Sequence, residues 1–183
     1  CCFLVSAARD ILTMGGLFSY PLLPNLLPLQ KIESLVPDSW NIDPISSLLH
    51  QAQLHLTFLS VRVVYQARLT KAYDNINPRA QIAKYLTLDT RFAQLHGAYM
   101  NGMEFFPLYT AAVLSCVAVD MDTDRLKKMC TTAVLLRVVY YFLYSVQHTK
   151  GGAALRSLSW IMSLAHTCQM LRSAANEYNE NTL

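Results

Sequence analysis

The stretch Asn101-Gly-Met-Glu104-Phe-Phe-Pro107 places two polar residues and a proline at intervals of three, just before a segment that is almost entirely apolar as far as Val119. In a helix, these three residues share one face. A charged side chain near the middle of a membrane helix costs roughly 2.5–3.5 kcal/mol. We therefore expect Glu104 to have a partner, and Arg137, in the next apolar segment, is the best candidate.

The composition favours a membrane protein. Hydrophobic residues make up 53% of the 183 residues and charged residues 15%, against about 25% charged residues in soluble domains. The net charge of +3 is small and the basic residues form no long run, so we expect no nucleic-acid partner. The five cysteines have no paired spacing and the histidines no metal-ligand spacing, so the sequence predicts neither a disulfide framework nor a metal site.

The pattern of apolar and turn residues predicts an all-α, integral-membrane four-helix bundle. A polar connection with possible helical turns is expected between the first and second helices. The expected helices cover roughly residues 43–73, 91–119, 125–146 and 153–175. We divide the chain into an N-terminal arm, a membrane domain and a polar, frayed tail. Their bounds are residues 1–45, 46–176 and 177–183.

The arm holds five of the seven prolines. Because proline removes a backbone donor and clashes inside a helix, the apolar segment Leu17–Leu29 is a poor spanning helix. We interpret the arm as an irregular segment that contacts a membrane or a partner. The chain begins with Cys1 rather than methionine, and a removed organelle-targeting peptide is our hypothesis for this start.

Each expected helix offers a polar group that can bind an anionic ligand. Arg137, Tyr140 and Tyr144 form a stripe on the third helix, and Arg156-Ser157 opens the fourth. Asn101 and Glu104 lie on the second, and Arg68 lies near the end of the first. Arginine binds carboxylates in bidentate fashion. Two readings stay open: a ligand site, or a buried Glu104–Arg137 pair with the tyrosines as interface aromatics.

At these residues the chain resembles the MAPEG family, the membrane-associated proteins in eicosanoid and glutathione metabolism, which include microsomal glutathione S-transferases. The resemblance covers roughly residues 48–176. The family pattern Asn-x-x-Glu-x-x-Pro is met from Asn101 to Pro107. Arg-x-x-Tyr-x-x-x-Tyr is met from Arg137 to Tyr144, and Arg156-Ser157 meets the Arg-Ser opening of the fourth helix.

The resemblance implies a homotrimer that binds glutathione between neighbouring subunits. In family members that use glutathione, residues matching Asn101, Glu104, Arg137, Tyr140 and Tyr144 hold the tripeptide. Arg68 stands where the family carries an arginine at the end of its first helix, and we include Arg68 and Ser157 among the expected binding residues. The arginine matching Arg156 stabilises the thiolate, so Arg156 is the expected catalytic residue. The expected activity is glutathione transfer or peroxidase-like chemistry on lipophilic substrates arriving from membrane lipid.

Two departures keep an alternative open. Gly97 stands where glutathione-using members carry an arginine, and Phe105 where a leukotriene-forming member has a tyrosine. The alternative is a non-catalytic structural subunit of a larger membrane complex, respiratory or photosynthetic, held to unrelated subunits through residues 1–45. A lipid-binding scaffold is a third reading. The expected membrane is that of the endoplasmic reticulum, a mitochondrion or a plastid.

Overall fold

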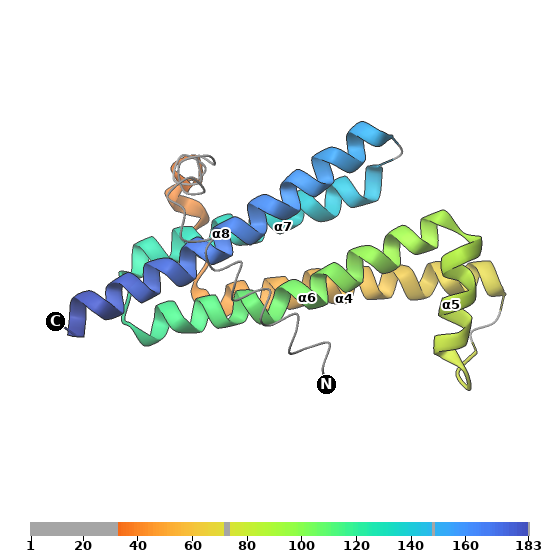
Figure 1. Cartoon of the computed structure of the whole chain (residues 1–183), viewed down its shortest axis with the longest axis horizontal. Helices are drawn as coiled ribbons and strands as arrows, with labels where there is room; N and C mark the ends of the chain where they lie inside the picture. Colours follow the sequence, from red (N-terminus) through yellow and green to blue (C-terminus); the bar gives the residue numbers. More distant parts are fainter. Residues whose placement is uncertain (1–32, 72–73, 148, 183) are drawn as a thin grey trace, which may run out of the picture. The chain divides into compact units, whose positions relative to one another are not determined.

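Helices make up most of the chain that the structure describes, and short turns and loops connect them. This computed structural model describes residues 33–71, 74–147 and 149–182. A short 3-10 turn, η1 (Asp38–Trp40), precedes the α-helices. The α-helices are α4 (Pro44–Thr70), α5 (Pro78–Leu88), α6 (Thr90–Ala118), α7 (Thr123–Val146) and α8 (Lys150–Thr182) (Figure 1). The all-α prediction is confirmed. The expected structure of the proline-rich segment 17–29 lies outside the described residues.

Aspartate caps set the starts of three long helices. The Asp43 carboxylate accepts a hydrogen bond of 2.9 Å from the Ser46 N–H, and Pro44 takes the first helical position of α4. Asp89 caps α6 and Asp122 caps α7 in the same way. A side-chain oxygen at this position satisfies one of the free N–H groups of the first turn. These starts therefore follow from the local sequence, as expected.

Two segments are more helical than we expected. The polar connection contains a complete helix, α5, which begins with Pro78 and contains no glycine. α8 continues to Thr182, through the segment for which the sequence predicts a frayed tail. No glycine or proline follows Gly152 to end α8, and Glu177 forms an ion pair of 3.8 Å with Arg125 of α7. This pair ties the last turns of α8 to the bundle.

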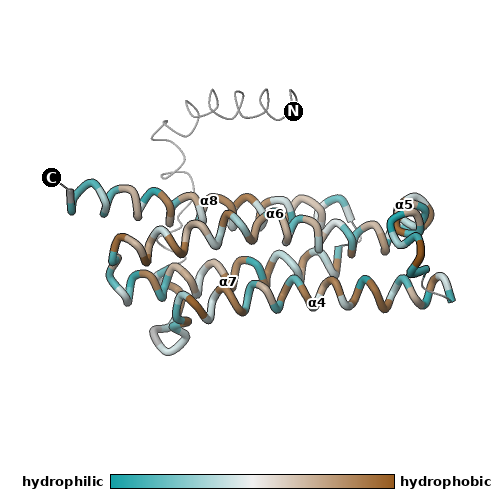
Figure 2. Tube along the Cα trace, turned by 90° about the horizontal axis from the view of Figure 1, so that it is seen from below, coloured by the Kyte–Doolittle hydropathy of each residue, from teal (hydrophilic) through white to brown (hydrophobic). Residues whose placement is uncertain are grey.

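Residues 36–183 form one compact unit. Within it, α6 and α7 lie between α4 and α8 and pack against both. The four long helices run side by side, and α5 lies across one end of them (Figures 1 and 2). The core is built largely from α6 and α7, with Phe92, Tyr109 and Met129 fully buried. Tyr109 donates a 2.7 Å hydrogen bond to Ser47 of α4, which joins two helices inside this core.

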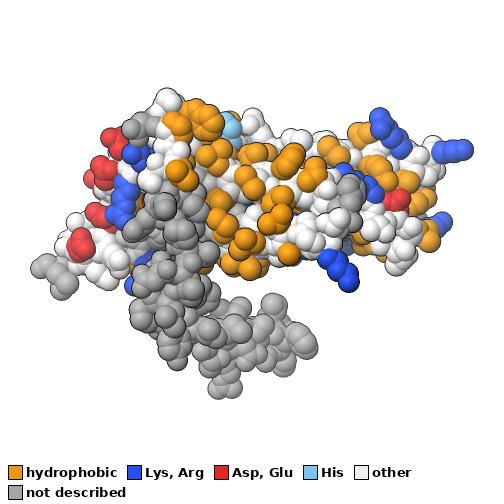
Figure 3. Space-filling view, turned by 90° about the horizontal axis from the view of Figure 1, so that it is seen from above, with side chains coloured by type: hydrophobic (Ala, Val, Ile, Leu, Met, Phe, Trp, Pro, Cys, Tyr) orange, Lys and Arg blue, Asp and Glu red, His pale blue; other side chains and the backbone are white. Residues whose placement is uncertain are grey.

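The surface of the bundle suits an apolar surrounding. All four long helices carry large exposed apolar side chains, among them Leu56, Leu114, Phe142 and Leu155. In Figure 3 hydrophobic side chains cover the middle of the face shown, and charged side chains gather toward the two ends. Among the described helices, α7 alone is long and apolar enough to cross a membrane by length and composition. How many helices cross the bilayer stays a prediction.

Candidate functional site

Three of the four long helices line a hollow of about 330 Å³. α6 contributes Asn101, and α7 contributes Tyr140 and Tyr144, which lie about one helical turn apart on the same face. The lining residues from α8 are Arg156, Ser157, Trp160 and Ile161. Five predicted site residues therefore meet in one hollow, although they come from distant parts of the sequence. Trp160 and Ile161 were not expected there, because nothing in their spacing separates them from other apolar residues of α8.

Polar contacts connect the walls of this hollow. The Asn101 side-chain N–H donates a hydrogen bond of 2.8 Å to the Tyr140 hydroxyl. The Arg156 guanidinium lies over the ring of Tyr144, 4.8 Å from its centroid, and its Nη2 donates to Ser157 Oγ at 3.5 Å. Cation–π contact orients the guanidinium without neutralising its charge. The hollow therefore combines one half-buried cation with hydroxyl and amide groups, a set that fits an anionic ligand.

Arg137 lies behind the tyrosine wall and has no solvent exposure. Its guanidinium carbon is 4.2 Å from the ring centroid of Phe105 and 4.5 Å from that of Tyr140. Its Nη2 donates to the backbone carbonyl of Asn101 at 3.4 Å, while Nε and Nη1 have no hydrogen-bond partner. The aromatic rings around the Arg137 guanidinium hold its charge in place, and two of its nitrogen donors have no hydrogen-bond partner among the described residues.

The predicted pair between Glu104 and Arg137 is wrong for the single chain. Glu104 is exposed on α6, and neither ion pair found among the described residues involves it or Arg137. Helical geometry gives the reason. Asn101 and Phe105, four residues apart, both contact Arg137, whereas Glu104 is rotated about 100° from Phe105 around the helix. Glu104 consequently lies outside the hollow.

Arg68 also lies outside the hollow. It is exposed in the last turn of α4, and the lining residues come from α6, α7 and α8 alone. The assignment of Arg68 and Glu104 to a ligand site stays a prediction, because a site completed by a second chain would draw on exposed residues of this kind.

A buried polar cluster between α4, α6 and α7 was not anticipated. The two ring nitrogens of His55 and the hydroxyl of Tyr141 are buried without hydrogen-bond partners. The two rings meet edge to face with centroids 6.0 Å apart, and the Arg137 guanidinium lies 5.3 Å from the Tyr141 ring centroid. Gly102 packs directly against the His55 ring and the Tyr141 hydroxyl. Only tertiary packing brings these residues together, so the sequence carried no signal for them.

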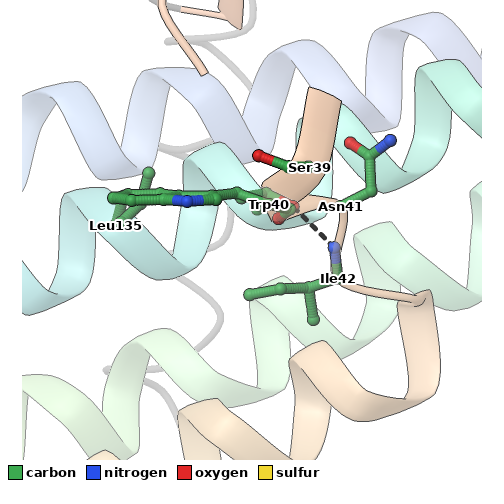
Figure 4. A pocket seen from close by; sticks show the side chains of 6 residues that line it. Ser39, Trp40, Asn41, Ile42 and Leu135 are labelled. Atoms are coloured by element: carbon green, nitrogen blue, oxygen red, sulfur yellow. Dashed lines mark hydrogen bonds between the residues drawn. The ribbon is translucent and has the colours of Figure 1, made fainter. Parts of the chain in front are cut away.

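A second hollow, of about 320 Å³, lies between η1 and α7. Trp40 and Leu135 border it, and the Ile42 N–H donates a 2.9 Å hydrogen bond to Thr131 Oγ1 across it (Figure 4). The Thr131 hydroxyl can in turn donate to the Trp40 carbonyl at 3.0 Å. No charged side chain lines this hollow, so we do not treat it as a candidate catalytic or anion-binding site.

The comparisons with known proteins identify one family. The model of the MAPEG family matches residues 51–176. This range contains all the residues that line the first hollow. No curated protein and no solved structure matches the chain.

Proposed function

The chain belongs to the MAPEG family, and on that premise we propose that this membrane protein binds glutathione in the hollow beside Arg156. The activity that we propose is the transfer of the thiol to lipophilic electrophiles, or the reduction of lipid hydroperoxides. One observation carries the proposal: Arg156 lies over Tyr144 in the same hollow as Asn101 and Tyr140. The four residues come from three helices, and their hydrogen-bond donors favour an anionic ligand.

The residues present fit a small acidic thiol. Arg156 supplies a half-buried positive charge, and Asn101 and the tyrosines supply donors and acceptors for an amide backbone. A free thiol has a pKa of about 8.5, and only its thiolate is a good nucleophile. A guanidinium beside the sulfur favours the charged form and so lowers the pKa. Arg156 would hold the thiolate, and Ser157 would hold a neighbouring polar group.

Glu104 supports the part of the proposal that concerns assembly. The carboxylate is exposed on α6, close to the exposed side chains of Met100 and Met103. A carboxylate that faces lipid is costly, so we propose that a neighbouring subunit covers it in a homotrimer. Such an arrangement would place Glu104 at the edge of a site shared between chains. Arg137, which is fully buried, would act on the site through Tyr140 and Asn101, which it contacts.

The test is a titration of the purified protein with glutathione, read by the ultraviolet absorbance of the thiolate. We expect a thiolate signal for the wild type that disappears in Arg156→Ala. Arg172→Ala is the matched control, because Arg172 is an exposed arginine of the same helix that does not line the hollow. No thiolate and no binding at millimolar glutathione would overturn the enzyme proposal.

The alternative function is a non-catalytic subunit of a larger membrane complex. The exposed Glu104 fits this reading too, since an unrelated subunit could cover it. Native mass spectrometry in a mild detergent separates the two. A homotrimer supports the enzyme, whereas one copy bound among unrelated subunits supports the structural role. The choice between endoplasmic reticulum and an organelle membrane is a proposal for localisation imaging to test.

A further inference from the structure

We propose that the end of the bundle where α5 lies binds the anionic headgroups of a lipid bilayer, with α5 in the plane of the membrane surface. We call this region the α5 end. It comprises the last turn of α4 with its C-cap Lys71, residues 74–77, all of α5 and the first turn of α6. Its basic residues are Arg68, Lys71, Arg79, Lys84 and Arg91. The proposal is independent of glutathione binding and goes beyond it.

Among the described residues, the acidic side chains at the α5 end accept hydrogen bonds from backbone N–H groups and form no ion pair with the basic residues there. Asp74 accepts backbone hydrogen bonds of 2.8 Å from Ile76 and 2.9 Å from Asn77. Asp89 caps α6 by accepting the Phe92 N–H at 2.6 Å. In the described part of the chain, no ion pair involves a basic residue of the α5 end. The five basic side chains therefore have no acidic partner within the described chain.

At the opposite end of the bundle, basic side chains form ion pairs with acidic side chains. Both ion pairs of the described residues lie there, between Arg125 and Glu177 and between Lys127 and Asp124. A count of Lys and Arg alone does not separate the two ends, because both carry them. The two ends differ in whether their basic side chains form ion pairs: Lys127 pairs with Asp124 on its own helix, and Arg125 pairs with Glu177 through the tertiary structure. The α5 end thus gathers five basic side chains without an ion pair, whereas both ion pairs of the described residues lie at the opposite end.

Apolar side chains accompany this charge. Ile76 is 88% exposed and Leu88 67% exposed, next to the basic residues. α5 lies across the end of the long helices (Figures 1 and 2), which places it parallel to a bilayer surface if the long helices cross the bilayer. Exposed apolar side chains together with Lys and Arg, on a short helix and in the turn before it, are typical of segments at a lipid interface. The charge and the apolar groups together therefore favour a lipid surface over an acidic protein.

The test compares lipids that remain bound to the full chain. The protein is placed in nanodiscs of equimolar phosphatidylcholine and phosphatidylglycerol, and native mass spectrometry measures the ratio of the two lipids retained. We expect the wild type to retain phosphatidylglycerol preferentially. The double variant Arg79→Gln/Lys84→Gln should lower that ratio by up to about 25-fold, since each basic residue near an anionic surface contributes a factor of about five.

The control variant Lys127→Gln/Arg172→Gln removes two charges from the opposite end and should leave the ratio unchanged. Equal retention of both lipids by the wild type would overturn the proposal and leave an acidic protein as the partner of the α5 end. An equal loss in the control variant would overturn it too, because the preference would then follow net charge alone. Circular dichroism confirms that each variant is folded before the comparison.

Discussion

Gly97 of α6 lies directly beneath the hydroxyl of Tyr144, so closely that a β-carbon at position 97 would be 2.6 Å from that oxygen. The Arg156 guanidinium in turn lies over the ring of Tyr144. Because Gly97 has no side chain, Tyr144 can lie close to α6. The position of Arg156 in the hollow depends in turn on the position of Tyr144. Gly97, one of the two departures that we noted from the pattern of glutathione-using members, is therefore part of the site's geometry.

From this relationship we expect Gly97→Ala to weaken glutathione binding severalfold while leaving stability nearly unchanged. The crowding of Tyr144 costs free energy, but alanine gains up to about 1 kcal/mol over glycine inside a helix. Isothermal titration of Gly97→Ala, Tyr144→Phe and the double variant measures the coupling. The double variant should bind no worse than Tyr144→Phe alone. Fully additive losses would show that Gly97 acts independently of Tyr144.

Gly102→Ala should destabilise the protein instead. Its β-carbon would overlap both the Tyr141 hydroxyl and the His55 ring, and both side chains are buried with at most 3% exposure. Overpacking of this kind typically costs 1–3 kcal/mol. Thermal unfolding in detergent, followed by circular dichroism, should show a clear fall in the midpoint. An unchanged midpoint would mean that the cluster around His55 rearranges freely.

Substitutions of Arg137 should separate packing from binding. Because its charge is buried without an acidic partner among the described residues, Arg137→Met keeps the volume and should change the free energy of unfolding by less than about 1.5 kcal/mol. Arg137→Ala leaves a cavity beside Phe105 and should cost about 2–5 kcal/mol. Both should bind glutathione at least tenfold more weakly. Retained binding in the methionine variant would assign Arg137 a purely structural role.

The cap of α4 should make stability depend on pH at the acidic end. Hydrogen bonds from Ser46, first from its side chain and then from its N–H, lower the pKa of Asp43 below the ordinary 3.8. The folded state therefore prefers the carboxylate. Its contribution to stability is complete above the ordinary pKa and disappears as the pH falls through the lowered one.

Asp43→Asn, which caps without titrating, should lack this acid-dependent loss. The measurement is the unfolding midpoint of both proteins between neutral pH and pH values below the ordinary pKa. The difference between the two midpoints should change in this acidic range and stay constant above it. A constant difference over the whole range would contradict the assignment.

The sequence by itself determined the starts of three long helices and the family. Aspartate caps at Asp43, Asp89 and Asp122 and the long apolar runs are local features, so the starts of α4, α6 and α7 could be predicted from them. The spacing of Asn101, Tyr140 and Tyr144 indicated residues that the fold then brings to one hollow. The extension of α8 to Thr182 was missed because its contact with Arg125 is not local.

Only the tertiary structure decided which of the polar residues meet. Glu104 and Arg137 have opposite charges and suitable positions on neighbouring helices, yet the rotation of α6 points Phe105 toward Arg137 and leaves Glu104 exposed. The same packing buried His55 beside Tyr141, and no ion pair among the described residues involves a basic side chain of the α5 end. Spacing along one helix states which residues share its face, but the direction of that face depends on how the helices pack.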